Sequence, residues 1–323
     1  MKFLHRLDAL EDRVMLVETD INRLKQASFL DGREQFWSRS SVESGSSLAG
    51  DALGHDKGMV GWIFHVGFCG STLLTRLLES SCEVLSLREP QCLVDLSDQL
   101  AQARTNGKLT QIERWLNTAS AHFAALPGGD RKTIIKPSNW ANPLLPLLEA
   151  AGLLHHALFV TMERRAWLHA CVRGGRDRLA YVARCADHAV RADPKPSHME
   201  LLQSAITGTA DPIDQAVRLA ALLYELQNAG FDRIDPLSRR RLDYAEIAAS
   251  PADALHKAQT LLGISAIPSD PGIVGWHAKD PKRRFDKDAR EQEDRAVNAE
   301  HSDRIDAAMA WIDDEKRTVT LDD

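Results

Sequence analysis

The sequence lacks a membrane-spanning run and the cysteine patterns of disulfide or zinc frameworks. A spanning helix needs about 20 consecutive apolar residues, and no run in these 323 residues approaches that length. The five cysteines are scattered and include no C-x-x-C pair, which indicates reduced thiols and predicts no metal site. The N-terminal MKFLHRLDALEDRV has no uninterrupted apolar core, unlike a secretory signal. We therefore expect a cytoplasmic protein.

The sequence also lacks an excess of basic residues. It contains 40 Lys and Arg against 46 Asp and Glu, a formal net charge of −6. Nucleic acids and anionic membranes attract proteins with a net positive field, so we expect neither as a partner. Any anionic ligand must be held by a local basic cluster.

Alternation of buried-looking strands and amphipathic helices predicts the fold. The run MVGWIFHVG from residue 59 has the continuous apolar character of a strand buried on both faces. Strand and helix patterns then alternate, which favours a mostly parallel central sheet with helices on both faces. We therefore predict a three-layer α/β fold of the P-loop type. The further predicted strands are 84–87, 133–137, 155–162 and 239–247, and the predicted helices include 71–81, two stretches within 91–125, 143–151, 164–173 and a segment after Ser250.

Composition divides the chain into three predicted regions. Residues 1–58 combine a helix over 1–30, inferred from apolar spacing, with a linker rich in Ser and Gly. Residues 59–290 form the α/β domain, which contains a helical insertion at about 176–230. Residues 291–323 are predicted to form a charged C-terminal helix.

The segment GFCGSTLL links the first predicted strand to the first helix of the domain. Glycines permit positive φ and close backbone approach, and a helix N-terminus presents amide groups and partial positive charge to an anion. We therefore predict a phosphate- or sulfate-binding loop. The Walker A pattern requires a lysine directly after its second glycine; here serine follows, which argues against ATPase or GTPase activity. The loop residues are Gly67, Phe68, Cys69, Gly70, Ser71 and Thr72.

Four segments together resemble the P-loop sulfotransferases, especially their bacterial and tyrosyl-protein members. They cover about residues 59–290 in the family's order: FHVGFCGSTLLTRLLES with VLSLREP, TIIKPSNWANPLLPLL, RLDYAEIAASPADALHKAQTLLGI, and HAKDPKRRFD. The resemblance implies metal-free transfer of a sulfuryl group from 3′-phosphoadenosine 5′-phosphosulfate to a small-molecule or peptide acceptor. It also implies that the loop binds the phosphosulfate.

Two positions depart from the family pattern. Phe68 stands where the family keeps a lysine or arginine. The family's arginine, with a serine eight residues later, is also not reproduced: Arg164 and Arg165 occupy the region, and Cys171 lies near the expected serine.

Polar residues at predicted strand ends are the candidates for chemistry. Glu89 follows one predicted strand and Lys136 lies at the end of another, and the carboxyl ends of parallel strands meet at the ligand-binding edge of a sheet. We interpret Glu89 as the base for the acceptor and Lys136 as a cation that offsets the charge missing at Phe68. Ser138 is a weaker candidate for donor binding. The basic segment containing Lys279, Lys282, Arg283 and Arg284 would hold the 3′-phosphate.

The leading hypothesis is therefore a sulfotransferase-like enzyme acting on a hydroxyl or amine. One alternative is a non-catalytic nucleotide- or anion-binding module on the same fold, suggested by Phe68. Another is a magnesium-dependent small-molecule kinase with a degenerate loop.

Overall fold

The computed structural model describes residues 1–45, 48, 60–126, 132–265, 276–277, 280–284 and 287–318, with the backbone alone between 276 and 290. The chain forms two compact units. Unit 1 comprises Met1–Val160 and Arg240–Arg283, and unit 2 comprises Thr161–Arg239 and Arg284–Asp323. The predicted loop, Glu89 and Lys136 all belong to unit 1.

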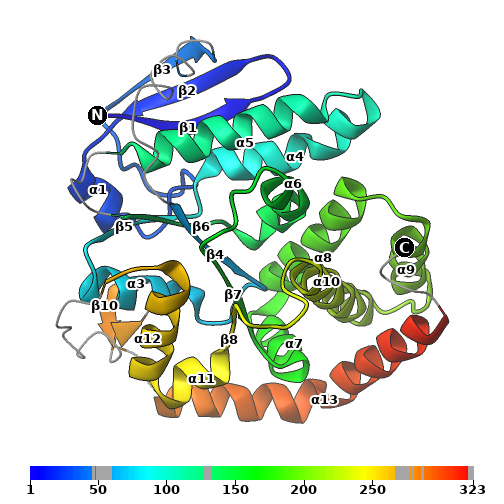
Figure 1. Cartoon of the computed structure of the whole chain (residues 1–323). Helices are drawn as coiled ribbons and strands as arrows, with labels where there is room; N and C mark the ends of the chain where they lie inside the picture. Colours follow the sequence, from blue (N-terminus) through cyan, green and yellow to red (C-terminus); the bar gives the residue numbers. More distant parts are fainter. Residues whose placement is uncertain are drawn as a thin grey trace. The chain divides into compact units, whose positions relative to one another are not determined.

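A five-stranded sheet forms the centre of unit 1, with strand order β5-β6-β4-β7-β8 (Figure 1). Parallel register joins β4 to both β6 and β7, and β5 to β6. Each of the five strands overlaps a segment predicted from sequence, but in the predicted strand 239–247 only Arg241–Asp243 is a strand and the helix α11 begins at Tyr244. Their bounds are β4 Val60–His65, β5 Val84–Arg88, β6 Lys132–Lys136, β7 Ala157–Thr161 and β8 Arg241–Asp243.

Helices cover both faces of this sheet, as the continuous apolar strands predict. Every residue of β5 and β7 is buried, which requires packing on both sides. Figure 1 shows α3 and α12 on one side of the sheet and α4, α5 and α6 on the other. The α/β fold class is thereby confirmed. The helices of unit 1 near the sheet are α3 Ser71–Ser81, α4 Gln91–Thr105, α5 Leu109–Ala124, η1 Asn139–Leu144, α6 Leu145–Ala150, α11 Tyr244–Ala249 and α12 Pro251–Leu262.

The central strand β4 marks the topological switch point of the sheet. The chain passes from β4 through α3 to β5, which lies beyond β6; after β6 it crosses to β7 on the other side of β4. In sheets of this type, ligands bind at the carboxyl ends of the strands where the order reverses. The turn after β4 is residues 66–70, so the predicted anion loop lies at this position.

The predicted helix over residues 1–30 is wrong. The structure has two antiparallel strands there, β1 Lys2–Asp8 and β2 Arg13–Glu18, followed by the short helix α1 Ile21–Gln26. A third strand, β3 Arg39–Ser44, pairs with β2 in the predicted linker. Most of residues 46–59 lie outside the described residues. Three successive side chains of β1 are buried beside a register shift between Leu4 and Arg6. The alternation typical of a strand is therefore interrupted in the sequence, and the apolar spacing resembled that of a helix.

Unit 2 consists of helices in the part of the chain that the structure describes. The helix α13 carries few apolar residues, yet Ile305, Ala308 and Ile312 are buried. Asp313 of α13 accepts two hydrogen bonds from Arg164 at 2.8 Å each. None of the described helices is long and apolar enough to cross a membrane. The helices are α7 Arg164–Arg173, α8 Gly175–Ala192, α9 Pro196–Thr207, α10 Pro212–Ile234 and α13 Lys287–Thr318.

Candidate anion-binding site at the end of strand β4

The loop after β4 adopts left-handed backbone conformations at three positions. The φ angles are 83° at Gly67, 55° at Phe68 and 78° at Gly70. Glycine takes such angles without strain, whereas a side chain there costs about 1–2 kcal/mol. Phe68 therefore carries backbone strain, and strained non-glycine residues often occur at functional sites.

Both loop glycines also lie against neighbouring side chains. A Cβ at Gly67 would be 3.1 Å from the Nδ2 atom of Asn139, and a Cβ at Gly70 would be 2.8 Å from the ring of Tyr244. Sequence reasoning missed Tyr244, although it lies in one of the four segments that resemble the family. The two close approaches explain why glycine is needed twice in this turn.

The loop leads directly into the first turn of α3. Gly70 is the N-cap residue and offers no side chain, so the first amide groups of α3 have no acceptor within the helix. Ser71 and Thr72 are buried in this turn. Such a turn, with its amides and partial positive charge, suits a sulfate or phosphate oxygen.

His65, the last residue of β4, braces the loop. The Gly67 N–H donates to Nδ1 of His65 at 3.0 Å, and Nε2 lies 3.0 Å from the carbonyl oxygen of Pro137. The amide of Asn142 donates to the His65 carbonyl at 3.1 Å. The Gly67 amide, predicted as part of the anion cradle, is thus engaged within the protein.

Cys69 is a packing residue of the loop. Its side chain is fully buried and donates to the Val160 carbonyl at 3.4 Å. Burial raises the pKa of the Cys69 thiol to about 11; the Ser71 amide and the positive charge of Lys136 act in the opposite direction. A raised pKa argues against a nucleophile.

Glu89 and Lys136 form a direct ion pair at the carboxyl ends of β5 and β6. The Nζ atom of Lys136 donates to Oε1 of Glu89 at 2.8 Å. The Lys136 side chain is 1% exposed and that of Glu89 15%. Glu89 has a φ of 57°, and its N–H donates to the Lys136 carbonyl at 2.7 Å. Sequence reasoning placed both residues at this edge but did not predict that they bind each other.

The second oxygen of Glu89 binds Arg33, which the sequence analysis had assigned to a linker. The distance from Arg33 Nη2 to Glu89 Oε2 is 3.0 Å. The same guanidinium pairs with Asp31 and lies over the ring of Phe29 at 4.1 Å from its centroid. The carboxylate is therefore held between a buried ammonium and an exposed guanidinium.

Arg88, adjacent to Glu89, has a structural role. Its guanidinium is buried and pairs with Glu79 at 2.5 Å. It also donates to the carbonyls of Lys25, Ala27 and Ser28. These bonds fasten the segment after α1 to the end of β5, so that Arg33 is held beside Glu89.

The remaining predicted site residues are placed as follows. Ser138 is the N-cap of η1, where its side chain accepts from the Trp140 amide at 3.4 Å. Lys279 lies outside the described residues. Lys282, Arg283 and Arg284 lie on the short strand β10 Asp280–Arg284, which pairs with β9 Trp276–His277. The structure describes only the backbone of these three residues.

In unit 2, the two arginines in the region of the family's arginine motif are paired with carboxylates. Arg164 binds Glu225 and Asp313, and Arg165 binds Asp306. These contacts fix α13 against the rest of unit 2.

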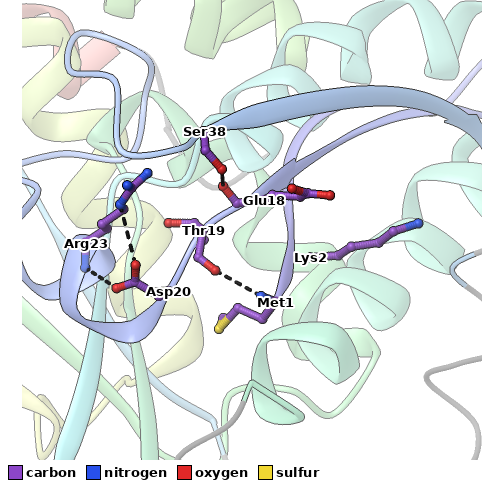
Figure 2. A pocket seen from close by; sticks show the side chains of 7 residues that line it. All are labelled: Met1, Lys2, Glu18, Thr19, Asp20, Arg23 and Ser38. Carbon is purple, nitrogen blue, oxygen red and sulfur yellow. Dashed lines mark hydrogen bonds and ion pairs between the residues drawn. The ribbon is translucent and has the colours of Figure 1, made fainter.

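A shallow cavity of about 370 Å³ lies in unit 1 beside α1 and the strands β1 and β2 (Figure 2). It is lined by Met1, Lys2, Glu18, Thr19, Asp20, Arg23 and Ser38. None of the predicted site residues lines it. Among the described residues, no group of three or more His, Cys, Asp or Glu side chains could hold a metal ion.

Comparison with known proteins gives structural similarity only. No family model and no curated protein matches the chain. Three sulfotransferase structures resemble it, at sequence identities of 13–16% and TM-scores of 0.36–0.39. The sulfotransferase domain from the curacin biosynthetic pathway has 13% identity and a TM-score of 0.39, and the match covers 77% of this chain and 98% of that one.

The other two structures have similarly low sequence identities and TM-scores. The sulfotransferase from Alicyclobacillus acidocaldarius has 16% identity and a TM-score of 0.36, covering 78% of this chain and 96% of that one. The sulfotransferase domain of the Synechococcus PCC 7002 olefin synthase has 14% identity and a TM-score of 0.38, covering 80% and 96%.

Proposed function

We propose that this chain is a sulfotransferase-like enzyme that uses 3′-phosphoadenosine 5′-phosphosulfate as its donor. The observation that carries the proposal is the loop 66–70 at the switch point, with Lys136 at the end of the adjacent strand β6. A switch-point loop that opens a helix suits the phosphosulfate. The sequence resemblance selects this donor over other anions.

The proposed reaction is an in-line displacement at sulfur. The oxygen or nitrogen of the acceptor forms a bond to sulfur, and the bond from sulfur to the bridging oxygen of the 5′-phosphate breaks. The acceptor proton passes to Glu89, and 3′,5′-adenosine bisphosphate leaves. Lys136 and the first amides of α3 stabilise the charge that develops on the bridging and sulfuryl oxygens.

The ion pair between Glu89 and Lys136 favours a second candidate, a non-catalytic nucleotide- or anion-binding module. In that case the pair serves stability alone, because each charge is already compensated by the other. Such a module binds adenosine bisphosphate and transfers nothing.

Calorimetric titration with 3′,5′-adenosine bisphosphate and a mass-spectrometric transfer assay separate these candidates. The assay uses the labelled donor with a panel of phenols, alcohols and amines. An enzyme gives turnover that Glu89→Gln and Lys136→Met reduce at least about 100-fold. The matched controls are Glu43→Gln and Lys2→Met, which dissolve an exposed ion pair of 2.7 Å on β1 and β3.

Three results are then distinguishable. Binding with turnover supports the enzyme. Binding without turnover of any acceptor supports the binding module. Absence of binding to both donor and bisphosphate at millimolar concentration contradicts both candidates.

A further inference from the structure

We propose that His65 is the positioning residue that sets the shape of the anion loop and its distance from Lys136. The identity of the ligand in this proposal rests on the proposed function, whereas the hydrogen bonds of His65 do not depend on it. His65 is the last residue of β4 and is almost completely buried, with 4% of its surface exposed.

The two ring nitrogens of His65 bind two different parts of the site. Nδ1 accepts from the Gly67 N–H at 3.0 Å, and Nε2 lies 3.0 Å from the Pro137 carbonyl. Pro137 directly follows Lys136, the last residue of β6. One imidazole therefore spans from the beginning of the loop to the residue beside the buried ammonium.

The hydrogen bonds fix the tautomer of His65. An amide N–H is only a donor, so Nδ1 must present its lone pair to Gly67. A carbonyl oxygen is only an acceptor, so Nε2 must carry the proton. We therefore assign the neutral Nε2–H form to His65.

This arrangement explains how the loop holds its shape without the basic side chain that a phosphate loop commonly supplies. Gly67 has a φ of 83° and Phe68 a φ of 55°, and a strained turn persists only where its surroundings hold it. The bond to Nδ1 holds the Gly67 amide inward. The later amides, which follow Gly70 in the first turn of α3, have no acceptor within the helix.

Two substitutions remove the two hydrogen bonds separately. In His65→Asn, the amide oxygen can take the place of Nδ1 and accept from Gly67, while nothing reaches Pro137. In His65→Gln, the longer amide can donate to Pro137, while nothing accepts from Gly67. The control is His256→Asn on α12, where the histidine is exposed.

The first test is nitrogen-15 NMR of histidine in the ligand-free wild-type protein, which requires neither activity nor a variant. We expect the Nε2–H tautomer for His65. An Nδ1–H tautomer or an imidazolium at neutral pH would overturn the assignment and the proposal with it.

The second test is hydrogen exchange of the Gly67 amide in the variants. We expect exchange at least about 10-fold faster in His65→Gln than in wild type, because one buried hydrogen bond is lost. In His65→Asn the protection of Gly67 should persist. Equal exchange in both variants and wild type contradicts the proposal.

The third test is the affinity for 3′,5′-adenosine bisphosphate. We expect each substitution to weaken binding about 3–10-fold, the effect of one hydrogen bond, and His256→Asn to leave it unchanged. Unchanged affinity in both His65 variants counts against a positioning role. If the wild-type protein does not bind the nucleotide, the proposed function fails, and the NMR and exchange measurements still decide the role of His65.

Discussion

The ammonium of Lys136 lies 2.8 Å from the carboxylate of Glu89, in a pair where the lysine side chain is 1% exposed. Burying one member of an ion pair so completely is costly unless the partner stays in place. The two residues proposed to perform chemistry are therefore also coupled in stability, and this coupling can be measured.

Lys136→Met should destabilise the protein by about 3 kcal/mol, because Glu89 then keeps only its exposed partner Arg33. The double variant that combines Lys136→Met with Glu89→Gln should lose about 2 kcal/mol less unfolding free energy than the two single variants lose in sum. Urea unfolding measures all three. The same cycle at Lys2 and Glu43 should give a coupling below about 1 kcal/mol. Additive losses at Lys136 and Glu89 would show that the pair is not energetically coupled.

Gly70→Ala should lower the free energy of unfolding by about 3 kcal/mol. The residue has a left-handed φ of 78°, and an added Cβ would lie 2.8 Å from the ring of Tyr244. Gly107→Ala is the matched control. Gly107 has a φ of 66° with nothing within 4 Å of an added Cβ, so only the backbone cost of about 1 kcal/mol applies. Thermal unfolding of both variants compares them. Equal losses would mean that the Tyr244 ring moves aside without cost.

Phe68→Lys should strengthen binding of adenosine bisphosphate about 10-fold, since it adds a charge-assisted contact to the loop. The gain should shrink as salt is raised from 50 to about 300 mM. Phe68→Leu controls for loss of the ring. A gain that salt leaves unchanged, or an equal gain in Phe68→Leu, would contradict an electrostatic origin.

Acid should weaken the attachment of α13 within unit 2. Hydrogen bonds from Arg164 lower the pKa of Asp313 below its usual 3.8. Because the carboxyl releases its proton more readily in the folded state, it stabilises the fold above pH 3.8, and this contribution is lost as the pH falls below that value.

The corresponding measurement compares wild type with Asp313→Asn. The variant should be less stable by about 1 kcal/mol at pH 7, and the difference should be smaller at about pH 3, below the usual pKa of the carboxyl. Asp314→Asn is the control, because its ion pair with Arg317 is highly exposed. A stability difference that is the same at both pH values would exclude titration of Asp313 as its cause.

The sheet and helices from β4 onward could be predicted because their sequence patterns are local. Continuous apolar runs marked the strands, and the patterns of α3 and α12 were unambiguous, with Gly263 ending α12 at a φ of 62°. The N-terminal segment could not be predicted, since its burial pattern follows a register shift and pairing with β3, some 25 residues later.

The site could be predicted only in part, for a related reason. Glu89, Lys136 and the loop lie at strand ends, which a parallel sheet brings to one edge. Arg33 reaches Glu89 across 56 residues of sequence, and no local pattern encodes that contact. Tyr244, whose ring approaches Gly70, is the first residue of α11. The sequence pattern predicted a strand at this position.

The fastening of Arg88 to the segment after α1 has a consequence for folding. The carbonyls that Arg88 binds lie 60 to 63 residues earlier in the chain, and the Leu30 amide donates to the Arg88 carbonyl. Such contacts require closure of a long loop, and so form late relative to local structure. The N-terminal segment must therefore wait for β5 before it can dock.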